Sequence, residues 1–198
     1  MTTNNQDQIA LAKKYGTPLF VYDASTIEQR VRELKDFGTI RFAMKALPNL
    51  AVLSLMKKLG VVVDCVSLGE LKRAKAAGFK LNAEHPEVVY TCDIFDRDSL
   101  SYVTENSIAV NMGSIEMIHQ YGPIAKRKNI TLRINPGFGH GHSQKTNTGG
   151  PSSKHGIWHE ELQQALAAAK KYDLIVEGIH MHIGSGTDFK HLSTVCDA

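Results

Sequence analysis

The feature that most limits the fold of this 198-residue chain is a repeated alternation of strand-like and helix-like segments. The run Val61–Val66 is continuous and rich in β-branched residues, which is typical of a strand covered on both faces. Gly60 and Gly78 follow helix-like segments, at the position where helices commonly end. Strands that alternate with helices predict an α/β fold with a parallel sheet and right-handed crossovers.

Six strand–helix units are expected from residue 40 onward, and a short strand over Leu19–Tyr22 and a helix with N-cap candidates Asp23 and Ser25 precede them. A doubly wound sheet and a closed barrel both fit such a pattern. Repeats of about 20–40 residues and polar strand ends favour a (β/α)8 barrel of the TIM type. The expected strands are 40–44, 61–66, 88–91, 108–110, 130–135 and 174–183, and the expected helices are 25–37, 48–59, 67–77, from Asp96, from Ser114 and near 159–170.

The length of the chain sets a limit on this barrel. A complete eight-stranded barrel takes about 250 residues, and the last expected helix still runs through Thr194–Ala198 without a glycine or proline to end it. We therefore expect an N-terminal portion of a longer protein, with the barrel truncated after about six βα units.

Composition narrows the classes of partner. The net charge is +3, from 23 basic and 20 acidic residues, and Lys126–Lys128 is the one tight basic cluster, so nucleic acid is not an expected partner. No stretch approaches the roughly 18 apolar residues of a membrane span. Cys65, Cys92 and Cys196 lack metal-ligand spacing, and their odd number argues against a disulfide framework. A protein of the reducing cytoplasm is expected.

Polar residues stand at the C-terminal ends of the expected strands, where βα folds place their chemistry. Lys45 is the least ordinary of them, because it closes the apolar run Ile40–Met44. It is either a solvated strand end or an amine held for imine formation with a carbonyl cofactor. The other strand-end residues are Asp64, Ser67, Thr91, Asp93, Asn111, Arg133, Asn135, His182 and Ser185.

The end of the last strand adds a possible phosphate site. Gly184-Ser185-Gly186 follows the strand and precedes a helix, so its amides and the Ser185 hydroxyl could hold a phosphate, although an ordinary turn fits equally well. His180 and His182 flank Met181, and we expect only one of them to point into the barrel. His182 is the better candidate because it lies nearer the turn.

The segment Gly137–Gly150 is the most unusual in the chain. A phosphate-binding P-loop is excluded, because Gln144 replaces the glycine before Lys145. A metal site is not favoured, because the histidines at 140, 142, 155 and 159 lack carboxylates or thiolates at standard spacing. A loop over the mouth of the barrel and a plain surface loop both remain open.

Five motifs carry a resemblance that covers essentially the whole chain. They are Phe42–Ala46, Val63–Glu70, Arg133–Gly150, Ser153–Gly156 and His180–Asp188. With them the chain resembles diaminopimelate decarboxylases, pyridoxal-phosphate enzymes of the alanine racemase-like fold group. The first motif would also fit ornithine or arginine decarboxylases.

The resemblance implies roles for particular residues. Lys45 would bind pyridoxal 5'-phosphate as an imine and later act as acid and base near the substrate α-carbon. His182 would stack on the cofactor ring, and Ser185 with the amides of Gly184 and Gly186 would hold the phosphate. Asp64 and Arg133 would line the cofactor pocket.

The resemblance also implies an activity and an assembly. The family converts meso-diaminopimelate to L-lysine and CO₂ in the last step of bacterial lysine synthesis, as a homodimer with shared active sites. Residues 1–23 would belong with a C-terminal β-domain missing here, and residues 24–198 would form a partial cofactor-binding barrel. We expect the 198-residue chain alone to be inactive. A related amino-acid decarboxylase or racemase, or a non-catalytic pyridoxal-phosphate-binding barrel, is the alternative.

Overall fold

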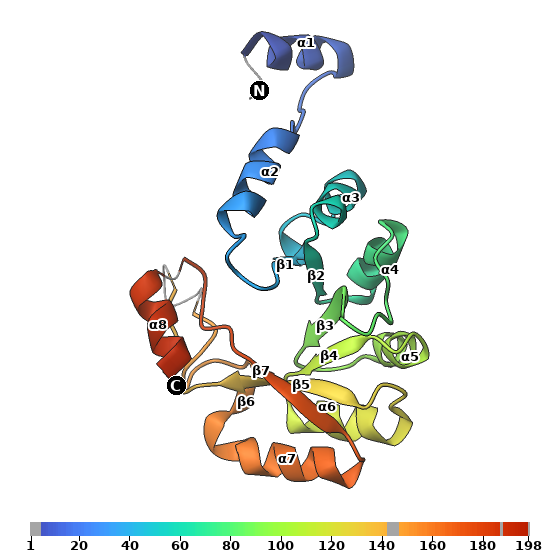
Figure 1. The fold of residues 1–198 in the computed structure, drawn as a ribbon, viewed down its shortest axis with the longest axis vertical. Helices are drawn as coiled ribbons and strands as arrows, with labels where there is room; N and C mark the ends of the chain where they lie inside the picture. The colour runs from blue at the N-terminus through green and yellow to red at the C-terminus, as the bar shows by residue number, and fades with distance from the viewer. Residues whose placement is uncertain (1–4, 142–146, 187, 198) are drawn as a thin grey trace.

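The sheet of this protein is built from parallel strands in the order of the chain (Figure 1). The computed structural model describes residues 5–141, 147–186 and 188–197. The strands are β1 Arg41–Ala43, β2 Val62–Cys65, β3 Val88–Cys92, β4 Ala109–Met112, β5 Asn129–Asn135, β6 Ile157–Trp158 and β7 Ile175–His180.

The strand order decides between the two architectures that the sequence leaves open. Strands β1 to β5 each pair with the next strand in the chain. The two-residue strand β6 pairs with the C-terminal end of β5, and β7 pairs with the preceding residues of β5. A doubly wound sheet reverses its strand order at a switch point, and no such reversal occurs among the described strands. The sheet curves from β1 round to β7 with helices on its outer side (Figure 1). This arrangement confirms the expected partial (β/α) barrel.

Polar N-cap residues start most of the helices. The side chains of Asp23, Asn49, Ser67, Asp96 and Ser114 each accept a hydrogen bond from a backbone amide in the first helical turn. The helix starts expected at Asp23, Ser67, Asp96 and Ser114 are therefore confirmed. The helices are α1 Asn5–Tyr15, α2 Ala24–Glu33, α3 Leu50–Lys58, α4 Leu68–Ala76, α5 Arg97–Glu105, α6 Ile115–Tyr121, α7 Leu162–Lys171 and α8 Phe189–Asp197.

Two expectations near the N-terminus are wrong. Leu19–Tyr22 is extended but is not a strand, because no described strand lies beside it to share hydrogen bonds, and its side chains are exposed. Strand β1 ends at Ala43, and Met44–Ala46 forms one turn of 3-10 helix. Lys45 therefore lies on a tight turn directly after the strand rather than on the strand itself.

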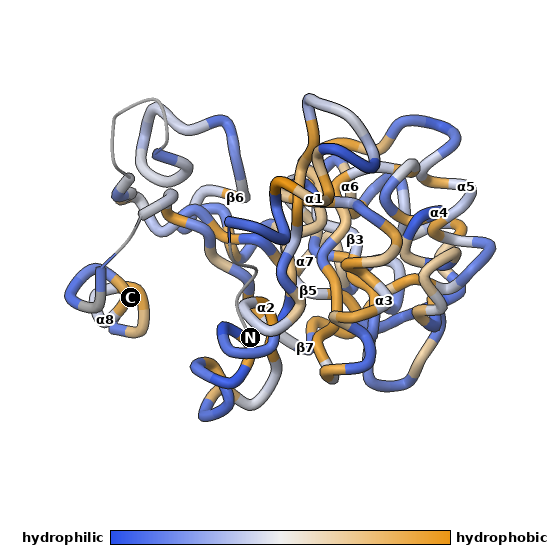
Figure 2. The backbone as a smooth tube through the Cα atoms, turned by 90° about the horizontal axis from the view of Figure 1, so that it is seen from above, coloured by the Kyte–Doolittle hydropathy of each residue, from blue (hydrophilic) through white to orange (hydrophobic). Residues whose placement is uncertain are grey.

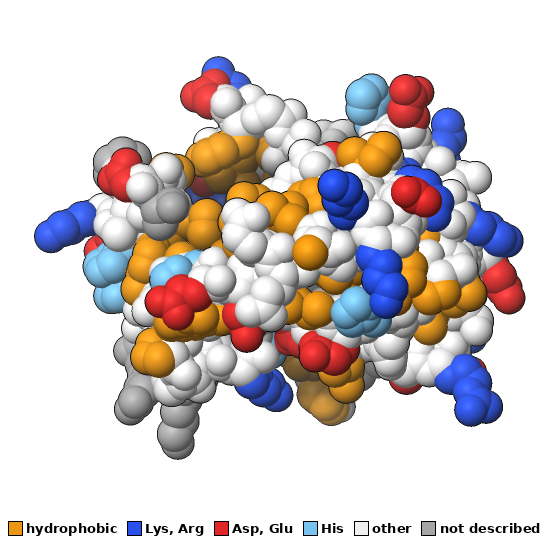
Figure 3. Space-filling view, turned by 90° about the horizontal axis from the view of Figure 1, so that it is seen from below, with side chains coloured by type: hydrophobic (Ala, Val, Ile, Leu, Met, Phe, Trp, Pro, Cys, Tyr) orange, Lys and Arg blue, Asp and Glu red, His pale blue; other side chains and the backbone are white. Residues whose placement is uncertain are grey.

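The hydrophobic core fills the space between the sheet and helices α3 to α7. Hydrophobic segments gather around β3, β5 and the adjoining helices, whereas α8 lies to one side (Figure 2). The outer face of β7 is different, since Ile175 and Ile179 are 57% and 58% exposed. On the face drawn in Figure 3, basic and acidic side chains are interspersed rather than gathered into one patch. In the part of the chain that is described, no helix is long and apolar enough to cross a membrane.

Candidate active site

A cavity of about 390 Å³ lies at the C-terminal ends of the strands, within the size range of small-molecule sites. Another cavity, of about 460 Å³ between α2, β1 and α3, is lined mainly by apolar side chains. The strand-end cavity is the candidate site because it brings together the predicted residues Lys45, Asp64, Arg133 and His182. Its lining consists of Ala43, Lys45, Asp64, Val66, Thr91, Cys92, Asp93, Arg133, Thr148, His155, His180 and His182.

Lys45 enters this cavity because of the turn after β1. Met44 is fully buried in the core, and the following residue, Lys45, lines the cavity. The positive charge of Lys45 affects its neighbours: it lowers the pKa of Asp64, against a larger opposing effect of burial, and it also lowers the pKa of His182. Lys45, Asp64 and His182 are thus brought together as the sequence predicts.

Asp64 is held by hydrogen bonds that cross three neighbouring strands. Asn111 Nδ2 on β4 donates to Thr91 Oγ1 on β3 at 2.7 Å, and the Thr91 hydroxyl donates to Asp64 Oδ1 on β2 at 2.5 Å. Burial raises the pKa of Asp64, opposed by this hydrogen bond and by the charges of Arg41 and Lys45. The carboxyl group therefore has a fixed direction in a desolvated wall of the cavity.

The same cavity also holds an ion pair. Arg133 Nη1 on β5 donates to Asp93 Oδ1 at 3.0 Å, and His155 Nδ1 bonds to Asp93 Oδ2. Arg133 is 8% exposed, so its charge needs a partner, and Asp93 supplies it. The predicted residue Arg133 is in the cavity, and Asp93 links it to His155, a histidine that the sequence did not place there.

Both His180 and His182 line the cavity, so the expectation that only one would point inward is wrong. Residues two apart along an extended chain point to the same face. Burial, with smaller effects from Arg133 and His182, lowers the pKa of His180 to about 4. Burial and the charge of Lys45 lower the pKa of His182. Both rings are therefore neutral and planar at neutral pH.

The described parts of the Gly137–Gly150 loop are hydrogen-bonded to residues in or next to the cavity lining. Thr148 Oγ1 donates to the carbonyl of His182 at 2.8 Å, and His140 N donates to the carbonyl of Ile183 at 2.9 Å. Asn135 exchanges two hydrogen bonds with the backbone of Gly150, at 2.8 and 2.9 Å. The loop therefore starts and ends beside the cavity. Residues 142–146, which include His142, Gln144 and Lys145, lie outside the described residues.

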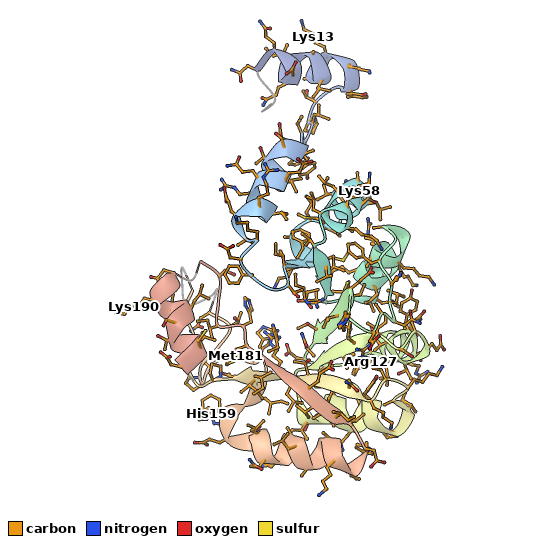
Figure 4. All side chains as sticks on the ribbon, viewed as in Figure 1. Lys13, Lys58, Arg127, His159, Met181 and Lys190 are labelled. Carbon is orange, nitrogen blue, oxygen red and sulfur yellow. The ribbon has the colours of Figure 1, made fainter. Side chains whose placement is uncertain are left out.

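The Gly184-Ser185-Gly186 turn lies beyond the cavity lining. Gly184 has φ +150°, and a Cβ there would overlap the carbonyl of His140, so the loop requires glycine at this position. Ser185 and Gly186 are exposed. Met181 lies where the chain leaves β7 and turns toward α8 (Figure 4). The phosphate-binding role of the turn stays a prediction.

Sequence reasoning did not name His180, Thr148 or His155 as site residues. His180 was set aside because only one of the two histidines was expected to point into the barrel, and Thr148 and His155 come from the segment between β5 and β6 rather than from a strand end. The Ser153–Gly156 motif was the available signal for His155. Among the described residues, no cluster of three or more His, Cys, Asp or Glu side chains could hold a metal ion.

Comparison with known proteins assigns the family. The profile described as "Pyridoxal-dependent decarboxylase, pyridoxal binding domain" matches residues 24–197. The chain belongs to the pyridoxal-dependent decarboxylase family.

Members of this family that resemble the chain include diaminopimelate decarboxylases. The protein of Streptomyces coelicolor is 50% identical over 188 residues, which cover 95% of this chain and 43% of that protein. A crystal structure of diaminopimelate decarboxylase superposes with a TM-score of 0.91 at 47% identity, over 97% of this chain and 46% of that one. The Helicobacter pylori enzyme complexed with L-lysine gives 0.81 at 28% identity, over 90% and 47%. The chain spans less than half the length of these relatives.

The residues of the cavity fit pyridoxal phosphate. Lys45 offers the amine for the aldehyde, and the neutral His180 and His182 rings offer planar surfaces for an aromatic ring. Arg133 offers a cation for the phosphate or the ring hydroxyl. This donor set is the one that an anionic carbonyl cofactor requires.

Proposed function

We propose that the protein to which this chain belongs decarboxylates meso-diaminopimelate to L-lysine and CO₂, with Lys45 as the catalytic residue. The observation that carries the proposal is the position of Lys45 in the strand-end cavity, facing Asp64 and two neutral histidines. The 50% identity to the diaminopimelate decarboxylase of S. coelicolor supports this substrate, as does the L-lysine complex of the H. pylori enzyme.

The cofactor, when bound, supplies an electron sink for the electron pair left on the α-carbon as CO₂ departs. Lys45 would hold the cofactor through its side-chain amine, and the same amine is placed to return a proton at the substrate α-carbon. Asp64, oriented by Thr91 and Asn111, stabilises the lysine whenever it carries that proton. The neutral ring of His182 would support the cofactor ring without adding positive charge to that of Lys45 and Arg133.

The outer parts of the site are assigned by the same proposal. Arg133 directs its charge into the cavity, and Ser185 with the amides of Gly184 and Gly186 closes on the phosphate. The described end of the Gly137–Gly150 segment, anchored through Thr148 and Asn135, covers one side of the cavity and shields it from water. The working enzyme is a cytoplasmic homodimer with shared active sites. Residues 1–23 pack with a β-domain, and residues 24–198 form the cofactor-binding barrel.

Borohydride reduction tests the central assignment. The 198-residue chain is incubated with pyridoxal phosphate, reduced, and mapped by peptide mass spectrometry. We expect the label on Lys45, its loss in Lys45→Ala, and no change in the matched control Lys58→Ala, whose side chain is exposed on α3. Label spread evenly over the surface lysines would contradict a preformed site.

A measurement of CO₂ release addresses the expectation for the isolated chain. We expect no turnover of diaminopimelate by the 198 residues alone, since the chain spans less than half the length of its relatives. CO₂ release that disappears in Lys45→Ala would overturn this expectation.

A further inference from the structure

The carboxylate of Asp93 is hydrogen-bonded to two separate parts of the chain, Arg133 on β5 and the adjacent residues His155 and Gly156. Arg133 Nη1 donates to Oδ1 at 3.0 Å, and the backbone amide of Gly156 donates to the same oxygen at 3.3 Å. His155 Nδ1 bonds to Oδ2. Asp93 thus ties the end of β3 to β5 and to the segment that enters β6.

Gly113 makes this arrangement possible. Strand β4 lies between β3 and β5, so the Asp93 side chain has to pass over the end of β4 to reach Arg133. A Cβ at position 113 would lie 2.5 Å from Asp93 Oδ1 and 2.8 Å from Asp93 Cα. Close-packed interiors do not accommodate such short contacts. The Asp93 side chain therefore fits here only because residue 113 is a glycine.

Asp93 and His155 also form the partition between two cavities. Both residues line the strand-end cavity and a neighbouring cavity of about 670 Å³ that includes Ser114 and Lys154. The orientation of the two side chains therefore determines what the strand-end cavity presents to a ligand on this side.

We propose that Asp93 is a positioning residue: it directs the guanidinium of Arg133 and holds the Nδ1 proton of His155, so that the cavity meets its ligand with one oriented cation and with Nε2 of His155. An ionised carboxylate only accepts hydrogen bonds, so Nδ1 of His155 has to carry the proton. Nε2 is then the nitrogen left for the cavity. The identity of the ligand, pyridoxal phosphate and the substrate bound to it, rests on the proposed function.

The tautomer of His155 is measurable in the ligand-free chain. Nitrogen-15 NMR of the histidine-labelled protein, with His155 assigned by a His155→Gln variant, is expected to show a proton on Nδ1 and a lone pair on Nε2. The Asp93→Asn variant is expected to lose the downfield Nδ1 proton signal, whereas the exposed control Asp36→Asn keeps it. A wild-type His155 protonated only on Nε2 overturns the proposal without any need for a variant.

The consequence for binding is tested with pyridoxal phosphate as the probe. Addition of the probe to wild-type chain is expected to shift the Nε2 resonance of His155. Asp93→Asn is expected to weaken binding roughly tenfold or more, because hydrogen bonds to charged groups are among the stronger ones, and Asp36→Asn leaves binding unchanged. An unmoved Nε2 resonance on binding, or wild-type affinity in Asp93→Asn, overturns the proposal. If the wild-type chain binds no pyridoxal phosphate, the proposed function fails, while the ligand-free tautomer still decides whether Asp93 positions His155.

Discussion

Strands β4 and β7 belong to one parallel sheet, yet their surroundings differ. Every residue of β4 is buried between β3 and β5 and under the neighbouring helices. Along β7, exposed residues alternate with half-buried ones, and it pairs with β5 alone among the described strands. The candidate active site takes one wall from each region. Asp64, Thr91 and Arg133 stand on the fully packed part, whereas His180 and His182 stand on and just beyond the open strand. The two walls therefore differ in how strongly packing fixes them.

The largest expected effect comes from removing the same side chain on two adjacent strands. Ile130 on β5 is 1% exposed, and Ile179 on β7 is 58% exposed. Ile130→Ala is expected to lower the free energy of unfolding by about 2–5 kcal/mol, and Ile179→Ala by less than about 0.5 kcal/mol. Denaturant unfolding monitored by circular dichroism measures both. Equal losses of unfolding free energy would mean that the exposed side of β7 is covered in solution. Strands β4 and β7 would then not differ in burial.

The next effect concerns pH and the open wall. Burial lowers the pKa of His180 from 6.5 to about 4 and also lowers that of His182. Between these two pH values the unfolded chain therefore binds more protons than the folded chain. The free energy of unfolding therefore falls as pH drops from 7 to 4, by an amount on the order of 2–3 kcal/mol for His180. Chemical denaturation across this range should show a shallower pH dependence in His180→Gln. An identical dependence in both proteins would show that His180 is not buried as described.

The smallest effect tests hydrogen bonding in the packed wall. Thr91→Val leaves Asp64 and Asn111 without their shared hydroxyl and is expected to cost about 1–2 kcal/mol. Thr104 is a matched control, because its buried hydroxyl has no hydrogen-bond partner in the described part of the chain. Thr104→Val should be neutral or stabilising for that reason. A neutral Thr91→Val would show that the chain of hydrogen bonds to Asp64 adds nothing to stability.

The sequence predicts local structure well where a single residue determines it. Ser67 and Ser114 cap helices because their hydroxyls reach the first free amides, which depends on a few neighbouring residues. The strand Leu19–Tyr22 was predicted on the same local grounds and is wrong, because a strand also needs a neighbour that its own residues do not specify.

The site was predictable to the extent that it follows from strand ends. Lys45, Asp64, Arg133 and His182 were found because parallel strands bring their C-terminal ends to one edge. His155 was not found, because its place depends on Asp93, a residue 62 positions earlier in the chain. Neither hydrophobic periodicity nor motif spacing predicts that His155 and Asp93 are in contact.

The order of the strands has a consequence for how the protein is made. Strands β1 to β5 each lie against the strand that precedes them in the chain, and β7 returns to β5. Pairing a strand with the one that precedes it closes a shorter loop than pairing strands far apart in the chain, so its entropic cost is smaller. During synthesis, each new strand can therefore join the sheet as soon as it leaves the ribosome, and the wall that carries Lys45 and Asp64 is assembled before the residues of β7 exist.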